Sequence, residues 1–99
     1  MEFSPELRDE VIAGGITVSV RLWQRPRVRV GGRYAIGPAQ LEVDSVELVP
    51  FSEISAEDVA RSGEADREAM RRRTAHAGPV SDETPVYRIE FHLVPLEAR

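Results

Sequence analysis

A run of alternating polar and apolar residues near the N-terminus carries the side chains best suited to chemistry. In GGITVSVRLW, residues 14–23, Thr17, Ser19 and Arg21 share one parity and would lie on one face of a β-strand. A serine hydroxyl becomes a nucleophile when a nearby base takes its proton, and an arginine holds a phosphate or carboxylate with two parallel N–H groups. This face therefore predicts a catalytic Ser19 or an anion-binding floor, unless it is only the solvated side of an ordinary strand.

Basic and aromatic side chains continue beyond this run. Between residues 11 and 41 the chain has no acidic residue and five arginines, namely Arg21, Arg25, Arg27, Arg29 and Arg33. This segment carries +5 and the rest of the chain −9, within a net charge of −4. Arginines beside Trp23 indicate an edge that contacts phosphates and stacks a base. The alternative is that Trp23 closes one end of the fold and the outer arginines pair with some of the 17 acidic residues.

Composition excludes several kinds of catalysis. The chain has no cysteine and no lysine, which removes disulfides, thiolate metal sites, cysteine nucleophiles and Schiff-base chemistry. Ser19 with His92 is the one serine–histidine combination worth testing, because the first and last predicted strands can be neighbours. Glu90 and His92 share a strand face, but two ligands do not make a metal site, and His76 lies in a predicted helix. We expect no metal and no cofactor.

Helical signals occur in three places. The predicted helices cover residues 5–13, the segment from Ser55 to Gly63, and residues 64–76. The first begins at Ser4-Pro5, where the hydroxyl suits the cap and proline suits the first helical position. The second begins with a capping box formed by Ser55 and Asp58. The third is rich in Ala, Arg and Glu and ends before a Gly-Pro pair.

The remaining signals predict short strands. Alternating or extended segments occur at residues 14–23, 27–30, 33–36, 41–49 and 85–94. In LEVDSVELV, residues 41–49, the apolar parity changes after Val43, which predicts a β-bulge near Asp44-Ser45. Short strands without regular βαβ alternation favour an α+β fold, here a small, mostly antiparallel β-barrel with helices at its ends.

Length and composition predict a single domain over residues 1–99. The chain is long enough for one hydrophobic core, and its 41% hydrophobic and 30% charged residues are typical of a globular protein. No apolar run approaches the roughly 20 residues that cross a membrane, and MEFSPELRDE has no signal-peptide pattern. We therefore expect a cytoplasmic protein with no membrane partner.

Five short segments form an ordered pattern from Leu7 to Val94. They are Ala13-Gly14, Ile16–Arg21, Val30–Tyr34, Gly63 and Tyr87–Phe91. In this order and spacing they resemble the ASCH domain family. ASCH domains are PUA-like β-barrels, so the resemblance implies a cleft floored by the polar face of the first strand. Because the family is widely regarded as RNA-binding, RNA or a nucleotide-like ligand is the implied partner. Taken together with the basic segment around Trp23, the resemblance predicts Thr17, Ser19, Arg21, Trp23, Arg25 and Arg33 as the contact residues.

Some small bacterial ASCH proteins of similar length are amidohydrolases of acylated cytidine nucleosides, with a catalytic lysine, threonine and glutamate. At the matching positions this chain has Ile16, Ser19 and Ser62, and Glu64 follows two residues after Ser62. Ser19 keeps a hydroxyl, but no amine is present to take its proton, whereas Arg21 is kept. The resemblance therefore favours binding of RNA or a nucleotide. Hydrolysis of a substrate such as N4-acetylcytidine by a different catalytic set is the alternative.

Overall fold

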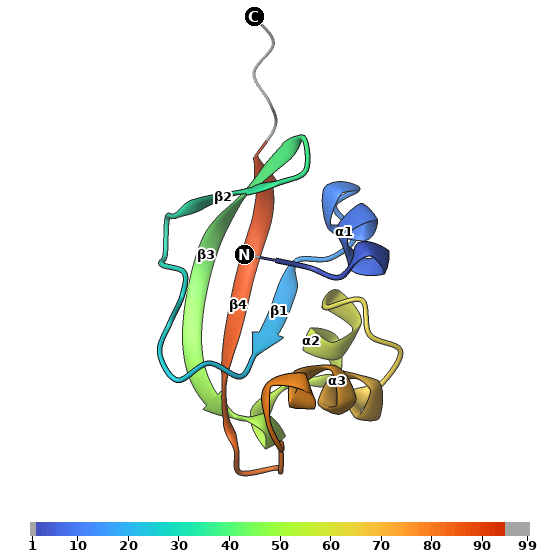
Figure 1. Cartoon of the computed structure of the whole chain (residues 1–99), viewed down its shortest axis with the longest axis vertical. Helices are drawn as coiled ribbons and strands as arrows, with labels where there is room; N and C mark the ends of the chain where they lie inside the picture. Colours follow the sequence, from blue (N-terminus) through green and yellow to red (C-terminus); the bar gives the residue numbers. More distant parts are fainter. Residues whose placement is uncertain (1, 95–99) are drawn as a thin grey trace, which may run out of the picture.

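The computed structural model describes residues 2–94 and has an antiparallel sheet with three α-helices along one side (Figure 1). In chain order the elements are α1 (Pro5–Ile12), β1 (Val18–Arg21), β2 (Arg33–Ile36), β3 (Ala39–Pro50), a 3₁₀ turn (Phe51–Glu53), α2 (Ala56–Arg61), α3 (Arg67–Thr74), a second 3₁₀ turn (Ala75–Ala77) and β4 (Pro85–Val94). The helices lie near the β1 edge, and β2 lies at the opposite edge. The predicted α+β class is confirmed.

The sheet is open. Its strand order is β1-β4-β3-β2, and all neighbouring strands are antiparallel. Within residues 2–94, β1 and β2 are edge strands that do not pair with each other. Closing a barrel requires the two edge strands to hydrogen-bond to each other in a staggered register. β1 and β2 have four residues each and are not paired with each other. The predicted barrel is therefore not confirmed.

The predicted β-bulge is present in β3. Val43 pairs with Phe91 of β4, and the next paired residue is Ser45, opposite Glu90. Asp44 is the extra residue, so β3 continues in the opposite parity and Val46 pairs with Ile89 on the same face as Val43. The bulge thus keeps both apolar stretches of β3 on one face of the sheet.

Side-chain caps begin α2 and α3, but the predicted cap of α1 is absent, because Ser4 Oγ accepts a hydrogen bond from Arg73 Nη1 at 3.1 Å instead of one from the helix backbone. The predicted capping box begins α2: Asp58 N–H donates to Ser55 Oγ at 3.0 Å, and Ser55 N–H donates to Asp58 Oδ2 at 3.1 Å. α3 begins at Arg67, later than predicted, because Asp66 is its N-cap and accepts the N–H of Ala69 at 2.8 Å.

Two predicted strand segments are shorter or absent. The first strand covers only Val18–Arg21, because Gly14, with φ 85°, turns the chain after α1 and the N–H of Thr17 donates to the carbonyl of Arg61. Residues 27–30 form part of a loop instead of a strand. Val28 is buried in the core, and Gly31 N–H bonds to the carbonyl of Val43, so this loop is fixed to the sheet without strand pairing.

The hydrophobic core is divided between the two faces of the sheet. One cluster joins Val11 of α1 and Val28 of the loop to β4 residues Tyr87, Ile89 and Phe91. The other joins the segment that contains α2 and α3 to Val86, which has the opposite parity, and to Val20. The buried members of this second cluster are Phe51, Ile54, Val59, Met70 and Val86. Both faces are therefore covered, at least in part, by apolar contacts.

In an amphipathic sheet the apolar residues of neighbouring strands share one face. In β1, however, the polar residues lie on the face that is apolar in β4. Val18 and Val20 pair with Glu90 and Arg88, whereas Ser19 pairs with the buried Ile89. Because directly paired residues point to the same face, the polar residues of β1 lie on the apolar side of β4. Ser19 is accordingly only 8% exposed. The polar face of β1 is thus a sheltered surface instead of the solvated side of a strand.

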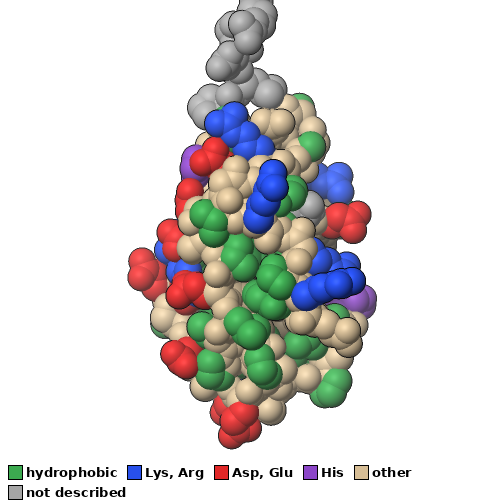
Figure 2. All heavy atoms as spheres, turned by 90° about the vertical axis from the view of Figure 1, so that its left-hand side faces the viewer, with side chains coloured by type: hydrophobic (Ala, Val, Ile, Leu, Met, Phe, Trp, Pro, Cys, Tyr) green, Lys and Arg blue, Asp and Glu red, His purple; other side chains and the backbone are tan. Residues whose placement is uncertain are grey.

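The side of the molecule that carries β2 and β3 has a mixed surface. Figure 2 shows hydrophobic side chains gathered over its lower part and acidic side chains along one margin. Val30 and Leu48, at 63% and 58% exposure, are the large hydrophobic residues that stand out from the described surface. No helix among residues 2–94 is long and apolar enough to cross a membrane.

Candidate functional site

A cleft of about 790 Å³ lies beside the edge strand β1. Its walls come from N-terminal residues 2–4, from β1 with the following Leu22 and Trp23, and from α3 with the 3₁₀ turn after it. This volume falls within the roughly 300–1,000 Å³ typical of small-molecule sites. Ser19, Arg21 and Trp23, three of the six predicted contact residues, line it together.

Arg21 is the central charged group of this cleft. Its Nε donates to Ser19 Oγ at 2.7 Å, and its Nη2 donates to the backbone carbonyl of Glu2 at 2.5 Å. The guanidinium carbon lies 5.0 Å from the ring centre of Phe3 and 6.0 Å from that of Trp23. Two aromatic side chains and one hydroxyl thus hold the guanidinium in a fixed position.

No carboxylate of the described residues lies close enough to Arg21 to form an ion pair with it. Among residues 2–94 no ion pair reaches it, whereas Arg61, Arg71, Arg73 and Arg88 each pair with one or more acids. Burial lowers the pKa of Arg21 from its ordinary value, and the negative charge of Glu2 partly opposes this. A guanidinium remains protonated at neutral pH even so. The cleft therefore contains a partly desolvated cation that an anion would stabilise.

Arg21 also keeps unused hydrogen-bonding capacity. A guanidinium has five N–H donors, and two of them bond to Ser19 and Glu2. The other three have no partner among the described residues. Bidentate recognition of a phosphate or carboxylate needs two adjacent donors. This arrangement can bind an anion without any proton transfer.

Further charged side chains line the cleft, and the sequence did not indicate most of them. Arg27 comes from the loop after β1, and Arg72 and Arg73 come from α3. The cleft has four arginines and two glutamates, Glu2 and Glu64, so two positive charges are in excess. Arg73 is largely occupied, because its Nε donates to Glu64 Oε2 at 2.5 Å. The sequence could not place Arg72 and Arg73 in the cleft, because the position of α3 relative to β1 depends on tertiary packing.

The other three predicted contact residues lie outside the cleft lining. Thr17 precedes β1, and its Oγ1 accepts a hydrogen bond from Arg61 Nε at 2.9 Å. Arg25 is exposed in the loop, and Arg33 on β2 forms an ion pair with Glu42. The structure therefore places Ser19, Arg21 and Trp23 together and Thr17, Arg25 and Arg33 elsewhere.

Ser19 has no histidine bonded to it. β1 and β4 are neighbours, as expected, but Ser19 pairs with Ile89, so His92, three residues further along β4, points to the other face. The imidazole of His92 instead contacts Asp44. Within residues 2–94 the hydroxyl of Ser19 accepts from Arg21, a cation that cannot take up its proton. The structure thus shows no activated nucleophile at Ser19.

The architecture is similar to that of a solved protein domain. A crystal structure of an ASCH domain from Lactobacillus crispatus JV V101 matches 89% of this chain and 70% of that chain, with a TM-score of 0.69 and 18% sequence identity. The chain has an ASCH-like fold. No protein-family model and no curated protein matches the sequence. In this ASCH-like fold the cleft lies along β1.

Proposed function

We propose that this ASCH-like domain is a binding module whose cleft holds a phosphate-bearing nucleotide or a segment of RNA. The observation that carries the proposal is Arg21, which lies in the cleft with three free N–H donors and no carboxylate partner among the described residues. We expect the domain to work in the cytoplasm, where both ligands are abundant, and without a cofactor.

The surroundings of Arg21 favour a nucleotide over a simple anion. Arg27 and Arg72 add positive charge to the same cleft, and neither forms an ion pair with a described acid. Trp23 is partly exposed there, and an aromatic ring can stack a base with a gain of about 1–3 kcal/mol. A phosphate on Arg21 and a base against Trp23 would use both features.

Hydrolysis of acylated nucleosides receives less support. Ile16, at the position of the lysine, is 2% exposed and packs against Gly63, and Ser62, at the position of the glutamate, is also buried and donates its hydroxyl to the carbonyl of Val59 at 2.7 Å. Glu64 lines the cleft but is held by Arg73. The positions that match the catalytic residues of the hydrolases thus lie near one another, but they have no amine, and the carboxylate of Glu64 is held by an arginine. Purified protein is expected to form no cytidine from N4-acetylcytidine, and turnover that Ser19→Ala abolishes would support hydrolysis instead.

The binding proposal can be tested with the one tryptophan of the chain as a probe. A nucleoside monophosphate, a short RNA and inorganic phosphate would each be titrated at low salt while Trp23 fluorescence and backbone amide signals are followed. The Arg21→Gln variant should weaken nucleotide binding at least about tenfold, since hydrogen bonds to a charged group contribute about 1.5–3 kcal/mol.

Arg25→Gln is the matched control, because Arg25 is exposed and lies outside the cleft lining. It should leave the affinity of a nucleoside monophosphate within about twofold, the range of a screened surface charge. Equal losses in the two variants, or no signal change around residues 19–23 of the wild type, would contradict the proposal. Equal affinity for inorganic phosphate and the nucleotide would remove the role of Trp23.

A further inference from the structure

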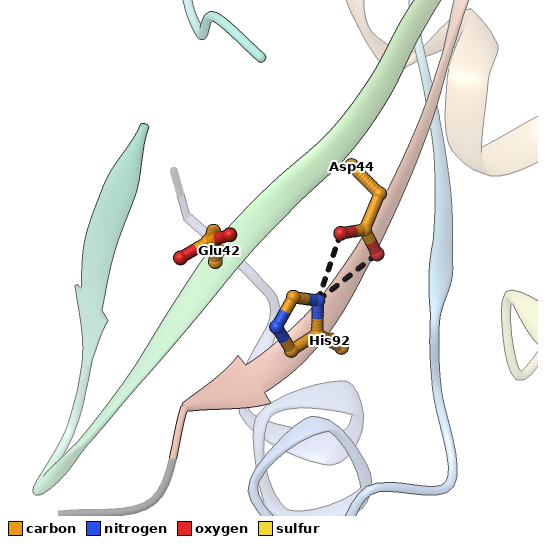
Figure 3. A group of neighbouring side chains, drawn as sticks. All are labelled: Glu42, Asp44 and His92. Atoms are coloured by element: carbon orange, nitrogen blue, oxygen red, sulfur yellow. Dashed lines mark hydrogen bonds and ion pairs between the residues drawn. The ribbon is translucent and has the colours of Figure 1, made fainter. Parts of the chain in front are cut away.

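A second group of side chains that could bind a ligand lies on the face of the sheet opposite to Ser19 and Arg21, outside the cleft lining. Glu42 and Asp44 of β3 and His92 of β4 each offer one ligand atom, and these atoms lie within 4.8 Å of one another. Figure 3 shows the two carboxylates projecting from β3 and the imidazole of His92 turned toward Asp44. None of the three residues lines the cleft.

Strand register and the β-bulge bring these side chains together. Glu42 pairs directly with His92, so both point to the same face of the sheet. Asp44 is the extra residue of the bulge between Val43 and Ser45, and its side chain lies against His92 on that face. The group is therefore built from the backbone geometry of two long central strands, and not from a mobile loop.

The distances are close to those of metal ligands. His92 Nδ1 lies 2.8 Å and 3.0 Å from the two carboxylate oxygens of Asp44. Ligand atoms about 2.0–2.1 Å from a tetrahedral Zn²⁺ are separated by roughly 3.3 Å. A small adjustment of these exposed side chains, together with rotation of Glu42, would place all three around one ion.

We propose that Glu42, Asp44 and His92 form a binding site for a divalent metal ion of the Zn²⁺ or Co²⁺ type. One imidazole nitrogen and two carboxylates suit such borderline ions, whereas Mg²⁺ and Ca²⁺ prefer all-oxygen sites. His92 and Asp44 are exposed, so water would complete the coordination. Sequence analysis considered Glu90 with His92, but Glu90 is held by Arg61 and Arg88.

Arg33 competes with the metal ion in this site. Its Nε lies 3.0 Å from Glu42 Oε1, and its side chain is 57% exposed, so the guanidinium can leave Glu42 for solvent. A bound divalent ion would replace one positive charge by two at the same carboxylate. The Arg33→Gln variant should therefore bind the ion about two- to fivefold more tightly, the equivalent of one exposed ion pair.

The chain offers a sharp test because it has two histidines and no cysteine. Zn²⁺ would be titrated into the protein without an affinity tag and followed by calorimetry, and Co²⁺ by its visible absorption. His92→Gln should weaken binding at least about tenfold, because losing a ligand costs no less than losing a supporting residue. His76→Gln is the matched control, and it should leave the affinity unchanged.

Each outcome decides the proposal. Loss of binding in His92→Gln, with retention in His76→Gln and a gain in Arg33→Gln, supports the site. No binding to the wild type, equal affinity of wild type and His92→Gln, or the same loss in both histidine variants overturns it. Thermal unfolding in the presence of a chelator checks that the variants are folded, which their exposed positions predict.

Discussion

Asp58 links the start of α2 to β4 through its two carboxylate oxygens. One carboxylate oxygen accepts from Ser55 N–H and completes the capping box of α2. The other accepts from Arg88 Nε and Nη2 at 3.0 Å and 2.8 Å. Arg88 also contacts Glu90 at 3.1 Å, and Glu90 is bonded to Arg61 at the end of α2. This one carboxylate therefore fixes α2 both at its start and against β4.

Replacing Asp58 by Asn is expected to lower the free energy of unfolding by about 3 kcal/mol, because it leaves a partly buried Arg88 without its main partner. Urea denaturation at neutral pH would measure this change. Asp82→Asn is the control: Asp82 pairs with Arg71 in an exposed position, so its loss should cost less than about 1 kcal/mol. Equal costs would show that Asp58 does not have the proposed role.

The same network predicts how stability depends on pH. Burial alone would raise the pKa of Asp58, but hydrogen bonds from Arg88 and Ser55 outweigh it and hold that pKa below its ordinary value of 3.8. Hydrogen bonding to Arg61 lowers the pKa of Glu90 below 4.5. For depressed carboxyl pKa values the stabilisation is present above the ordinary values and is lost as the pH falls through the folded-state values. The free energy of unfolding should therefore decline below about pH 4.5, and less steeply in Asp58→Asn.

At the scale of elements, local sequence signals predicted what local forces determine. The capping box at Ser55 depends on neighbours three residues apart, and the bulge at Asp44 and the last strand left a signal in the local alternation of apolar residues, although their pairing partners lie far along the chain. Sequence could not predict which parity of β1 faces the core, because the register of Val18 against Glu90 depends on strands far apart in the chain. The cleft was only partly predictable for the same reason: Arg21 is in the strand motif, whereas Phe3 and Arg72 reach the cleft through the packing of the N-terminal segment and of α3.

A substitution of Gly63, which follows α2, would test the contact between the end of this helix and Ile16 in the segment before β1. Its φ is 80°, and a Cβ there would lie 2.6 Å from Ile16 Cδ1 and 3.0 Å from its Cγ1. Gly63→Ala should cost about 2–3 kcal/mol through backbone strain and overpacking, measured by thermal unfolding. Gly14→Ala, with φ 85° but open space around it, should cost only about 1 kcal/mol.

A double variant separates the two causes. Ile16→Val removes the atom closest to the new methyl group, so Gly63→Ala should be less destabilising in that background than in the wild type. Strict additivity would mean that the strain is entirely in the backbone.

At the scale of the whole molecule, the distribution of arginines predicts the salt dependence of RNA binding. An RNA segment confined to the cleft would meet Arg21, Arg27 and Arg72, the three arginines there without a described acidic partner. Three phosphate contacts to a single strand give a slope of log affinity against log salt of about −2. Inclusion of the exposed Arg25 and Arg29 would give about −3.5. Titrations over a range of salt concentrations distinguish the two footprints, and a slope near zero would contradict phosphate contact.

The position of β4 in the sheet has a consequence for how the chain folds. β4 pairs with both β1 and β3, whereas only the β2–β3 hairpin can form from residues close in sequence. Pairing of β3 with β4 must close the whole segment from residue 51 to residue 84, at a cost in chain entropy that precedes any gain from contacts. We therefore expect most of the sheet to form in one step, and we expect this closure, instead of the formation of the short helices, to set the folding rate.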